Sequence, residues 1–178
     1  MEKVTCSVVF LSRDGWVYLA RGRKGMNDGY FNGYGGKQEV GETIAESGIR
    51  ETLEESGGVK VNPDSLRKIC VLISHSDKII KGLSRPQART LIVHFYIASK
   101  WAGQPKRTEA FEEAIRFDFD KLPLDQMLPN NRYWLAKALR STQPFVVEVW
   151  YETERDGKKI PERFTFHRQP DEKLIAAA

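Results

Sequence analysis

The sequence is short of the features that mark secreted and membrane-spanning proteins. It has two cysteines, Cys6 and Cys70, and no apolar run reaches the roughly 18 residues needed to cross a membrane. Both cysteines lie in apolar, strand-like runs, which is typical of buried free thiols in a reducing compartment. The N-terminal residues lack the layout of a signal peptide. We therefore expect a cytoplasmic protein without a membrane partner.

Histidine and excess charge are also scarce. The three histidines are widely separated and show no metal-ligand spacing, so we expect no catalytic histidine. The net charge is +4 with a pI near 9.0, which suits attraction of small polyanions but is too weak to indicate a stable nucleic-acid complex. The length of 178 residues predicts one domain over residues 1–170, with residues 171–178 as a frayed tail. We expect a monomer.

The most informative stretch runs from Gly36 to Gly58 and is centred on an acidic helix. Thr43 followed by Glu46 forms a capping box, which places the helix start near Ile44, and two glycines provide the left-handed stop. One side of this helix is mostly apolar and should dock on a sheet; its members are Ala45, Ile49, Thr52 and Leu53.

Three glutamates share the other side of the helix. Glu51, Glu54 and Glu55 are three or four residues apart or adjacent, so their side chains converge on one face and repel one another. A solvated acidic surface is one interpretation. A divalent cation held among hard oxygen ligands, Mg²⁺ or Mn²⁺, is the other.

The spacing within this stretch resembles the Nudix box, a pattern of G, five residues, E, seven residues, and R-E-aliphatic-x-E-E-x-G-aliphatic. Seven positions agree, namely Gly36, Glu42, Arg50, Glu51, Glu54, Glu55 and Gly57. Thr52 and Gly58 depart from it at two aliphatic positions, which concern packing. The resemblance implies a hydrolase that cleaves a nucleoside diphosphate linked to another group.

The resemblance also implies roles for individual residues. Glu51, Glu54 and Glu55 would hold the metal with the carbonyl oxygen of Gly35, and Arg50 would orient them. Glu42 would anchor the loop end of the motif. One further acidic ligand would come from a later loop, either Glu112 or its neighbour Glu113. Which glutamate acts as the general base stays open.

Two basic or glycine-rich segments precede the box. Arg23 and Lys24 lie in a compact cationic cluster, for which we expect phosphate contacts, with a soluble turn as the alternative. The glycine-rich loop before the helix lets the backbone approach a ligand closely, so Gly35, Gly36 and Lys37 join the candidate substrate-binding residues.

Similarity to the MutT-type oxidised purine nucleoside triphosphatases extends beyond the box. FNGYGGK resembles their W-N-G-F-G-G-K, and FDFDKLPLDQMLP followed by NNRYW resembles the segment before their last helix. This implies a purine pocket that contains Asn32 and Trp134, the latter as a stacking wall. Other pocket candidates are Leu128, Asn130, Asn131 and, on the first strand, Ser7.

One departure concerns base selectivity. The relatives carry an Asp pair where this chain has Asn130 and Asn131, and an Asn offers one fixed acceptor and one fixed donor. A helix N-cap is an alternative role for these residues.

The order of expected elements is strands, a helix, strands, a helix and strands. It predicts an α+β fold, a Nudix-like α/β/α sandwich with a mixed β-sheet. Strands are expected at residues 4–11, 16–20, 59–61, 68–74, 90–98, 115–119, 145–151 and 163–167, with an amphipathic helix after Asn131. The segment from Asp77 to Arg89 is an apparent insertion without an assigned role.

The expected function is a Mg²⁺-dependent pyrophosphohydrolase that converts modified purine nucleoside triphosphates, such as 8-oxo-dGTP, to monophosphate and pyrophosphate. Alternatives are another Nudix substrate (a dinucleoside polyphosphate, a nucleotide sugar or an RNA cap) or a non-catalytic nucleotide-binding module. The second is disfavoured because all three glutamates are present.

Overall fold

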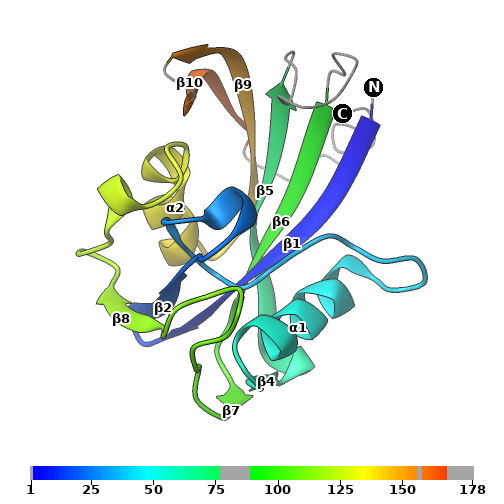
Figure 1. The fold of residues 1–178 in the computed structure, drawn as a ribbon, viewed down its shortest axis with the longest axis vertical. Helices are drawn as coiled ribbons and strands as arrows, with labels where there is room; N and C mark the ends of the chain where they lie inside the picture. Colours follow the sequence, from blue (N-terminus) through cyan, green and yellow to red (C-terminus); the bar gives the residue numbers. More distant parts are fainter. Residues whose placement is uncertain (1, 77–88, 156–157, 168–178) are drawn as a thin grey trace.

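A computed structural model describes residues 2–76, 89–155 and 158–167. The chain forms ten strands and two α-helices in these residues (Figure 1). The strands are β1 (Glu2–Arg13), β2 (Trp16–Arg21), β3 (Phe31–Asn32), β4 (Lys60–Val61), β5 (Leu66–Ser76), β6 (Arg89–Ala98), β7 (Trp101–Ala102), β8 (Ile115–Asp118), β9 (Phe145–Arg155) and β10 (Lys158–His167). The helices are α1 (Ile44–Glu55) and α2 (Asn131–Arg140).

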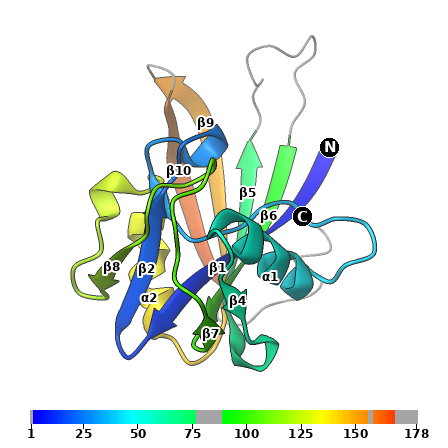
Figure 2. The same ribbon diagram turned by 60° about the horizontal axis from the view of Figure 1, so that its bottom comes forward.

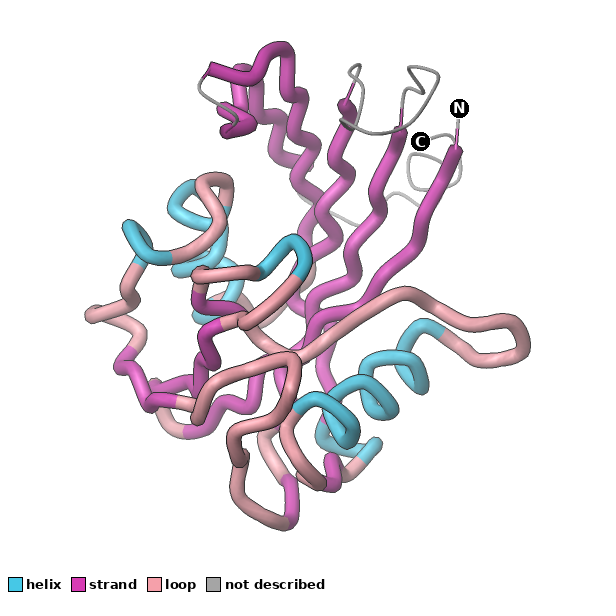
Figure 3. Tube along the Cα trace, viewed as in Figure 1, coloured by secondary structure: helices cyan, strands magenta, loops and turns pink. Residues whose placement is uncertain are grey.

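The main sheet has eight strands and is mixed. Its order is β10-β9-β5-β6-β1-β2-β3, with β8 paired to β2, while β4 and β7 form a separate two-stranded sheet. The pairs β1–β6 and β5–β9 are parallel, and the other pairs are antiparallel. The β1–β2 hairpin turns at Asp14 and Gly15, both with positive φ, as a two-residue hairpin turn requires. Figure 3 shows how the long strands cross the molecule between the two helices.

Alternation along β1 assigns one helix to each face of the sheet. Val8 and Phe10 belong to the core that includes α2 residues Trp134 and Leu135. Val9 and Leu11 face the opposite way, into a core packed against residues of α1. Figures 1 and 2 show α1 and α2 on opposite sides of the sheet. The predicted α/β/α sandwich is confirmed.

The capping signals at both ends of α1 are confirmed. The Glu46 N–H donates to Thr43 Oγ1 over 3.2 Å, and the Thr43 N–H donates to Glu46 Oε2 over 2.7 Å. Gly57 has φ +73°, which provides the left-handed stop. The predicted docking side was wrong in one residue, because Leu53 is 41% exposed.

Ala45 and Ile49 pack against the core as predicted, and small residues of α1 are buried beside them. Ser47, Gly48 and Thr52 are buried. A Cβ added at Gly48 would lie 2.8 Å from Val9 Cγ2, so the helix backbone approaches β1 closely. Leu53 is turned away because this close approach orients the helix on its smallest side chains.

Some expected segments lie outside the described residues. These are residues 77–88 of the expected insertion, whose last residue, Arg89, begins β6, and the tail at 171–178. Within the described parts, no helix combines the length and the apolar character that crossing a membrane would demand.

Candidate active site

The loop before α1 places two backbone positions against two of the helix glutamates. The Gly35 N–H donates to Glu55 Oε2 over 2.8 Å. Gly36 lies so close to Glu51 that an added Cβ would be 2.3 Å from Glu51 Oε1. A Cβ at position 36 would force the Glu51 carboxylate to move from its present place, whereas glycine leaves it there.

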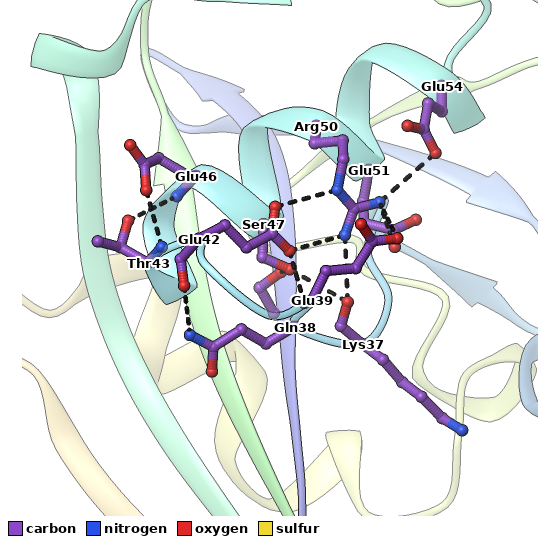
Figure 4. A network of polar contacts seen from close by, with 11 residues as sticks. Lys37, Gln38, Glu39, Glu42, Thr43, Glu46, Ser47, Arg50, Glu51 and Glu54 are labelled. Carbon is purple, nitrogen blue, oxygen red and sulfur yellow. Dashed lines mark hydrogen bonds and ion pairs between the residues drawn. The ribbon is translucent and has the colours of Figure 1, made fainter.

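Arg50 is the centre of a charged network on α1 (Figure 4). Its Nε and Nη2 atoms donate to the two oxygens of Glu42 over 3.0 and 2.8 Å, a two-point contact between guanidinium and carboxylate. The Glu39 N–H also donates to Glu42. Mainly because of the Arg50 contact, the pKa of Glu42 falls to about 2. Glu42 is therefore charged at any physiological pH and ties the loop to the helix.

The third nitrogen of Arg50 contacts two of the predicted metal ligands. Nη1 lies 2.9 Å from Glu51 Oε1 and 3.6 Å from Glu54 Oε2. Nη2 also donates to the Lys37 carbonyl oxygen over 3.2 Å. Figure 4 shows the Lys37 ammonium pointing away from this network, so Lys37 contributes its backbone here. Arg50 thus contacts Glu42, Glu51 and Glu54, as an orienting residue must.

Glu55 lies in a different environment from the other two glutamates. Burial raises its pKa to about 7; the charges of Glu51 and Glu54 act in the same direction, and the Gly35 N–H opposes them. A carboxyl group with this pKa exchanges its proton near neutral pH. Lys24 is close enough to lower the pKa of Glu55 slightly, so the cationic loop faces the end of α1.

The glutamates suit a divalent cation in chemistry but are not gathered around one point. Within residues 2–76, 89–155 and 158–167, no three acidic, histidine or cysteine side chains are arranged to hold a metal ion. Arg50 holds Glu51 and Glu54, and Gly35 holds Glu55. Three carboxylates on neighbouring turns still offer the hard oxygen donors that Mg²⁺ and Mn²⁺ prefer. The donor set fits, and binding would require these side chains to turn toward one another.

The predicted later ligand, Glu112, is held by two arginines. Arg23 Nε lies 3.0 Å from Glu112 Oε1, and Arg107 Nε lies 2.9 Å from Glu112 Oε2. Lys24 pairs with Glu109 over 3.0 Å. The structure therefore gives Arg23, Lys24 and Glu112 protein partners. Glu113, the alternative ligand, is exposed.

The predicted base-binding residues lie near α2, on the other side of the sheet. Phe31 bridges to Met127, which places β3 and Asn32 beside the segment that leads into α2. Asn32 donates to Asn27 Oδ1 and accepts from the Gly33 N–H. Leu128 is half-buried. The structure thus brings Asn32 and the Leu128–Asn131 segment into one region.

The two asparagines that begin α2 differ in their partners. Asn130 is fully engaged, because its Nδ2 donates to Tyr151 Oη over 2.6 Å and its Oδ1 accepts from Trp134 Nε1 over 3.4 Å. Asn131 is 2% exposed, and its Nδ2 has no hydrogen-bond partner among the described residues. Asn131 therefore has an amide donor that is unpaired among the described residues but enclosed by the protein.

Three of the expected roles need correction. Ser7 is fully buried under α1, where its hydroxyl donates to Ser47 Oγ, so it offers no surface to a substrate. Trp134 is 1% exposed and packs on Phe95 with ring centroids 4.5 Å apart, so neither ring face is free for stacking. Asn130 occupies the N-cap position without a side-chain capping bond, because its Oδ1, the atom that would accept from the helix backbone, accepts from Trp134 Nε1 instead.

Sequence reasoning missed two groups of residues. His75 and His167, far apart in the sequence, both contact Glu148, over 3.2 and 2.9 Å. They meet because β5, β9 and β10 are neighbours in the sheet, which no local spacing reveals. Arg107 was also missed, because local spacing does not show that its side chain pairs with Glu112.

The comparisons with known proteins agree with this geometry. Residues 1–138 match the NUDIX domain family, and the chain belongs to that family. A protein of Danio rerio named oxidized purine nucleoside triphosphate hydrolase is 31% identical over 134 residues, which cover 75% of this chain and 78% of that protein. A protein of the same name from Mus musculus is 31% identical over 124 residues, 70% of this chain and 72% of its own length.

Solved structures of MutT proteins have the same fold. The MutT protein of Bacillus halodurans has a TM-score of 0.66 at 20% identity, covering 96% of this chain and 100% of its own. A MutT NUDIX hydrolase of Burkholderia pseudomallei has a TM-score of 0.60 at 20% identity, covering 80% and 100%.

Proposed function

We propose that this protein is a Mg²⁺-dependent Nudix hydrolase that converts oxidised purine nucleoside triphosphates to the monophosphate and pyrophosphate. The observation that carries the proposal is the Arg50 network, which keeps Glu51 and Glu54 on one face of α1 while Gly35 holds Glu55. The names of the relatives that are 31% identical supply the substrate class.

The chain's own residues can orient the reacting groups and accept a proton. A divalent cation, when bound, neutralises charge on the phosphate oxygens and makes water more acidic. Glu51, Glu54 and Glu55 would hold that cation, with the Gly35 carbonyl as a further oxygen. The Gly35 N–H fixes the Glu55 carboxylate, and burial raises the pKa of Glu55 to about 7 when no cation is bound; on this basis we assign to it the proton released by the attacking water. Water adds at phosphorus, and the anhydride oxygen leaves with the pyrophosphate.

The base would be read in the region of α2. Asn131 has a buried amide donor without a hydrogen-bond partner among the described residues, and we assign to it a hydrogen bond to the purine, which would require this segment to open. Asn130 and Trp134 contact each other and act as positioning residues in this proposal. Asn32 is the further candidate for contact with the base, through an amide that Asn27 and Gly33 orient.

Several broader expectations remain proposals with specific support. The use of Mg²⁺ rests on oxygen donors, with Mn²⁺ as an alternative. A cytoplasmic location rests on the low cysteine content, two residues in the sequence, Cys6 and Cys70. A single domain over residues 1–170 is supported because β9 and β10 extend the sheet formed within residues 1–138. We also propose a monomer that forms no stable nucleic-acid complex.

A nucleotide panel tests the proposal. Purified protein with Mg²⁺ is incubated with 8-oxo-dGTP, dGTP, a dinucleoside tetraphosphate, a nucleotide sugar and a capped RNA fragment, and products are separated by ion-exchange chromatography. We expect the largest kcat/KM for 8-oxo-dGTP, with pyrophosphate as the inorganic product. Faster cleavage of a dinucleoside polyphosphate, sugar or cap would assign the enzyme to that Nudix activity instead, and no turnover would favour the binding module.

A further inference from the structure

Beside the end of α1, two arginines share one carboxylate. Arg23 Nε and Arg107 Nε contact the two oxygens of Glu112 over 3.0 and 2.9 Å. The side chains of Arg107 and Glu112 are 62% and 42% exposed, so the cluster is open to solvent. A carboxylate between two guanidinium groups occupies the position that two oxygens of a phosphate group would take.

The backbone fixes this cluster next to the glutamates of α1. The Thr108 hydroxyl donates to the Glu55 carbonyl oxygen over 2.9 Å, and the Lys106 N–H donates to the Ser56 carbonyl oxygen over 2.8 Å. The Arg23 N–H donates to the Ala110 carbonyl oxygen over 2.9 Å. Arg107 and Arg23 are therefore attached to two segments that meet at the C-terminal end of α1.

The two arginines differ in how firmly they are held. Arg23 Nη1 also donates to the Thr108 carbonyl oxygen over 2.6 Å, so its guanidinium is fixed by the backbone. Among the described residues, the polar partner of the Arg107 side chain is Glu112, which it contacts through Nε, so neither Nη atom is engaged in a hydrogen bond or ion pair there. Arg23 thus provides a fixed anchor, and Arg107 provides a second cation that can adjust to a ligand.

We propose that Arg23 and Arg107 form a phosphate subsite of this enzyme, and that Glu112 occupies the subsite until the polyphosphate of a substrate displaces it. The inference rests on the proposed function, because it assigns a place to the phosphates of that substrate. Exposed ion pairs are weak, whereas phosphate offers more charge and more acceptor oxygens than a carboxylate, so exchange favours the phosphate. Glu112 then becomes free to take another partner.

Binding of inorganic tripolyphosphate in EDTA tests the subsite without requiring metal or turnover. Isothermal titration calorimetry compares wild type with R107Q, E112Q and the control K106Q. Lys106 is an exposed cation in the same segment, without an ion pair among the described residues, so K106Q makes the same change in net charge. We expect R107Q to weaken binding about fivefold and E112Q to tighten it about fivefold, with K106Q changing it less than about twofold.

The outcomes separate this inference from the proposed function. Equal affinities of R107Q and K106Q, or weaker binding by E112Q, would overturn the subsite even if the nucleotide panel shows hydrolysis. The expected pattern without any hydrolysis would support the subsite and overturn the enzyme assignment instead. Circular dichroism of each variant confirms that it is folded, because all three side chains are exposed or half-exposed.

Discussion

The two helices present polar groups to their surroundings in different ways. On α1, charged side chains contact charged partners at or near the surface. The single side chain of Arg50 contacts Glu42, Glu51 and Glu54. On α2, neutral side chains are buried and hydrogen-bonded to one another, as Trp134 is to Asn130. We call Glu42, Arg50, Glu51, Glu54 and Glu55 the acidic region. We call the α2 region the buried group of Asn130, Asn131 and Trp134 with their neighbours Tyr151 and Phe95.

The difference indicates how each region contributes to function. In the acidic region, a cation and phosphates have to reach the charged side chains. The ion pairs among these side chains must therefore be able to give way to the ligand. The α2 region must keep its shape to discriminate between bases, so its contacts are packed and its polar groups are mostly satisfied. Changes in the acidic region should therefore reduce turnover, whereas changes in the α2 region should reduce stability and selectivity.

The largest expected effect is on turnover in the acidic region. We expect E55Q to lower kcat about a thousandfold, because an amide cannot accept the proton of the attacking water. Steady-state kinetics with Mg²⁺ measures this, and E39Q is the control, since Glu39 lies at the edge of the same network, 3.9 Å from Arg50. Undiminished turnover of E55Q would refute the role of Glu55 as base.

The next effect concerns stability in the α2 region. Trp134 is 1% exposed, so W134L should lower the free energy of unfolding by about 2–4 kcal/mol through lost packing. Urea denaturation measures the loss, and Y133L is the matched control, because the neighbouring Tyr133 is 51% exposed. Equal losses in the two variants would show that Trp134 does not have the buried packing described above.

A smaller effect tests Arg50 as an orienting residue. R50K keeps the positive charge but loses the two-point contact with Glu42 and the reach to both Glu51 and Glu54. We expect kcat/KM to fall about 10- to 100-fold, as for other residues that orient metal ligands. R132K, on the exposed side of α2, should leave kcat/KM unchanged. A loss confined to KM would argue that Arg50 binds substrate rather than orienting the glutamates.

The smallest effect is the dependence of stability on pH. The pKa of Glu55 is raised from 4.5 to about 7 in the folded protein, so the folded state binds a proton more tightly than the unfolded chain. The stability that comes from this tighter proton binding at Glu55 is fully present below pH 4.5 and is lost as the pH rises through 7. In EDTA at pH 8, E55Q should therefore be more stable than wild type by about 1–2 kcal/mol, with solvent screening allowed for.

Urea denaturation of wild type and E55Q between pH 5 and pH 8 measures how the difference in their free energy of unfolding changes with pH. The advantage of E55Q should shrink toward pH 5, where the wild-type carboxyl group is protonated. An advantage that does not change with pH would mean that Glu55 titrates normally in the folded state.

Local patterns predicted both ends of α1 because helix caps and stops follow from neighbouring residues. Thr43 and Glu46 are three residues apart, and this alone predicted the helix start that the structure has. The stop at Gly57 and the hairpin at Asp14 and Gly15 also follow from local backbone preferences. The mixed sheet between two helices was predicted from the order of elements.

The α2 region was predicted less well, because its contacts join distant parts of the chain. Asn130 was weighed as a helix cap, but its Oδ1 accepts from Trp134 Nε1, and its Nδ2 donates to Tyr151, 21 residues later. Trp134 was expected to stack on a ligand, but Phe95 on β6 covers it. Likewise, the pairing of Glu112 with Arg23 and Arg107 depends on how two loops meet, which sequence spacing does not encode.

Titration of the protein with Mn²⁺, followed by electron paramagnetic resonance of the free ion, tests the central claim most directly. The claim is that Glu51, Glu54 and Glu55 together hold a divalent cation. The account predicts saturable binding to wild type, at least tenfold weaker binding to E51Q, E54Q and E55Q, and unchanged affinity in E39Q. Absence of saturable binding to wild type, or equal affinity in all four variants, would contradict it.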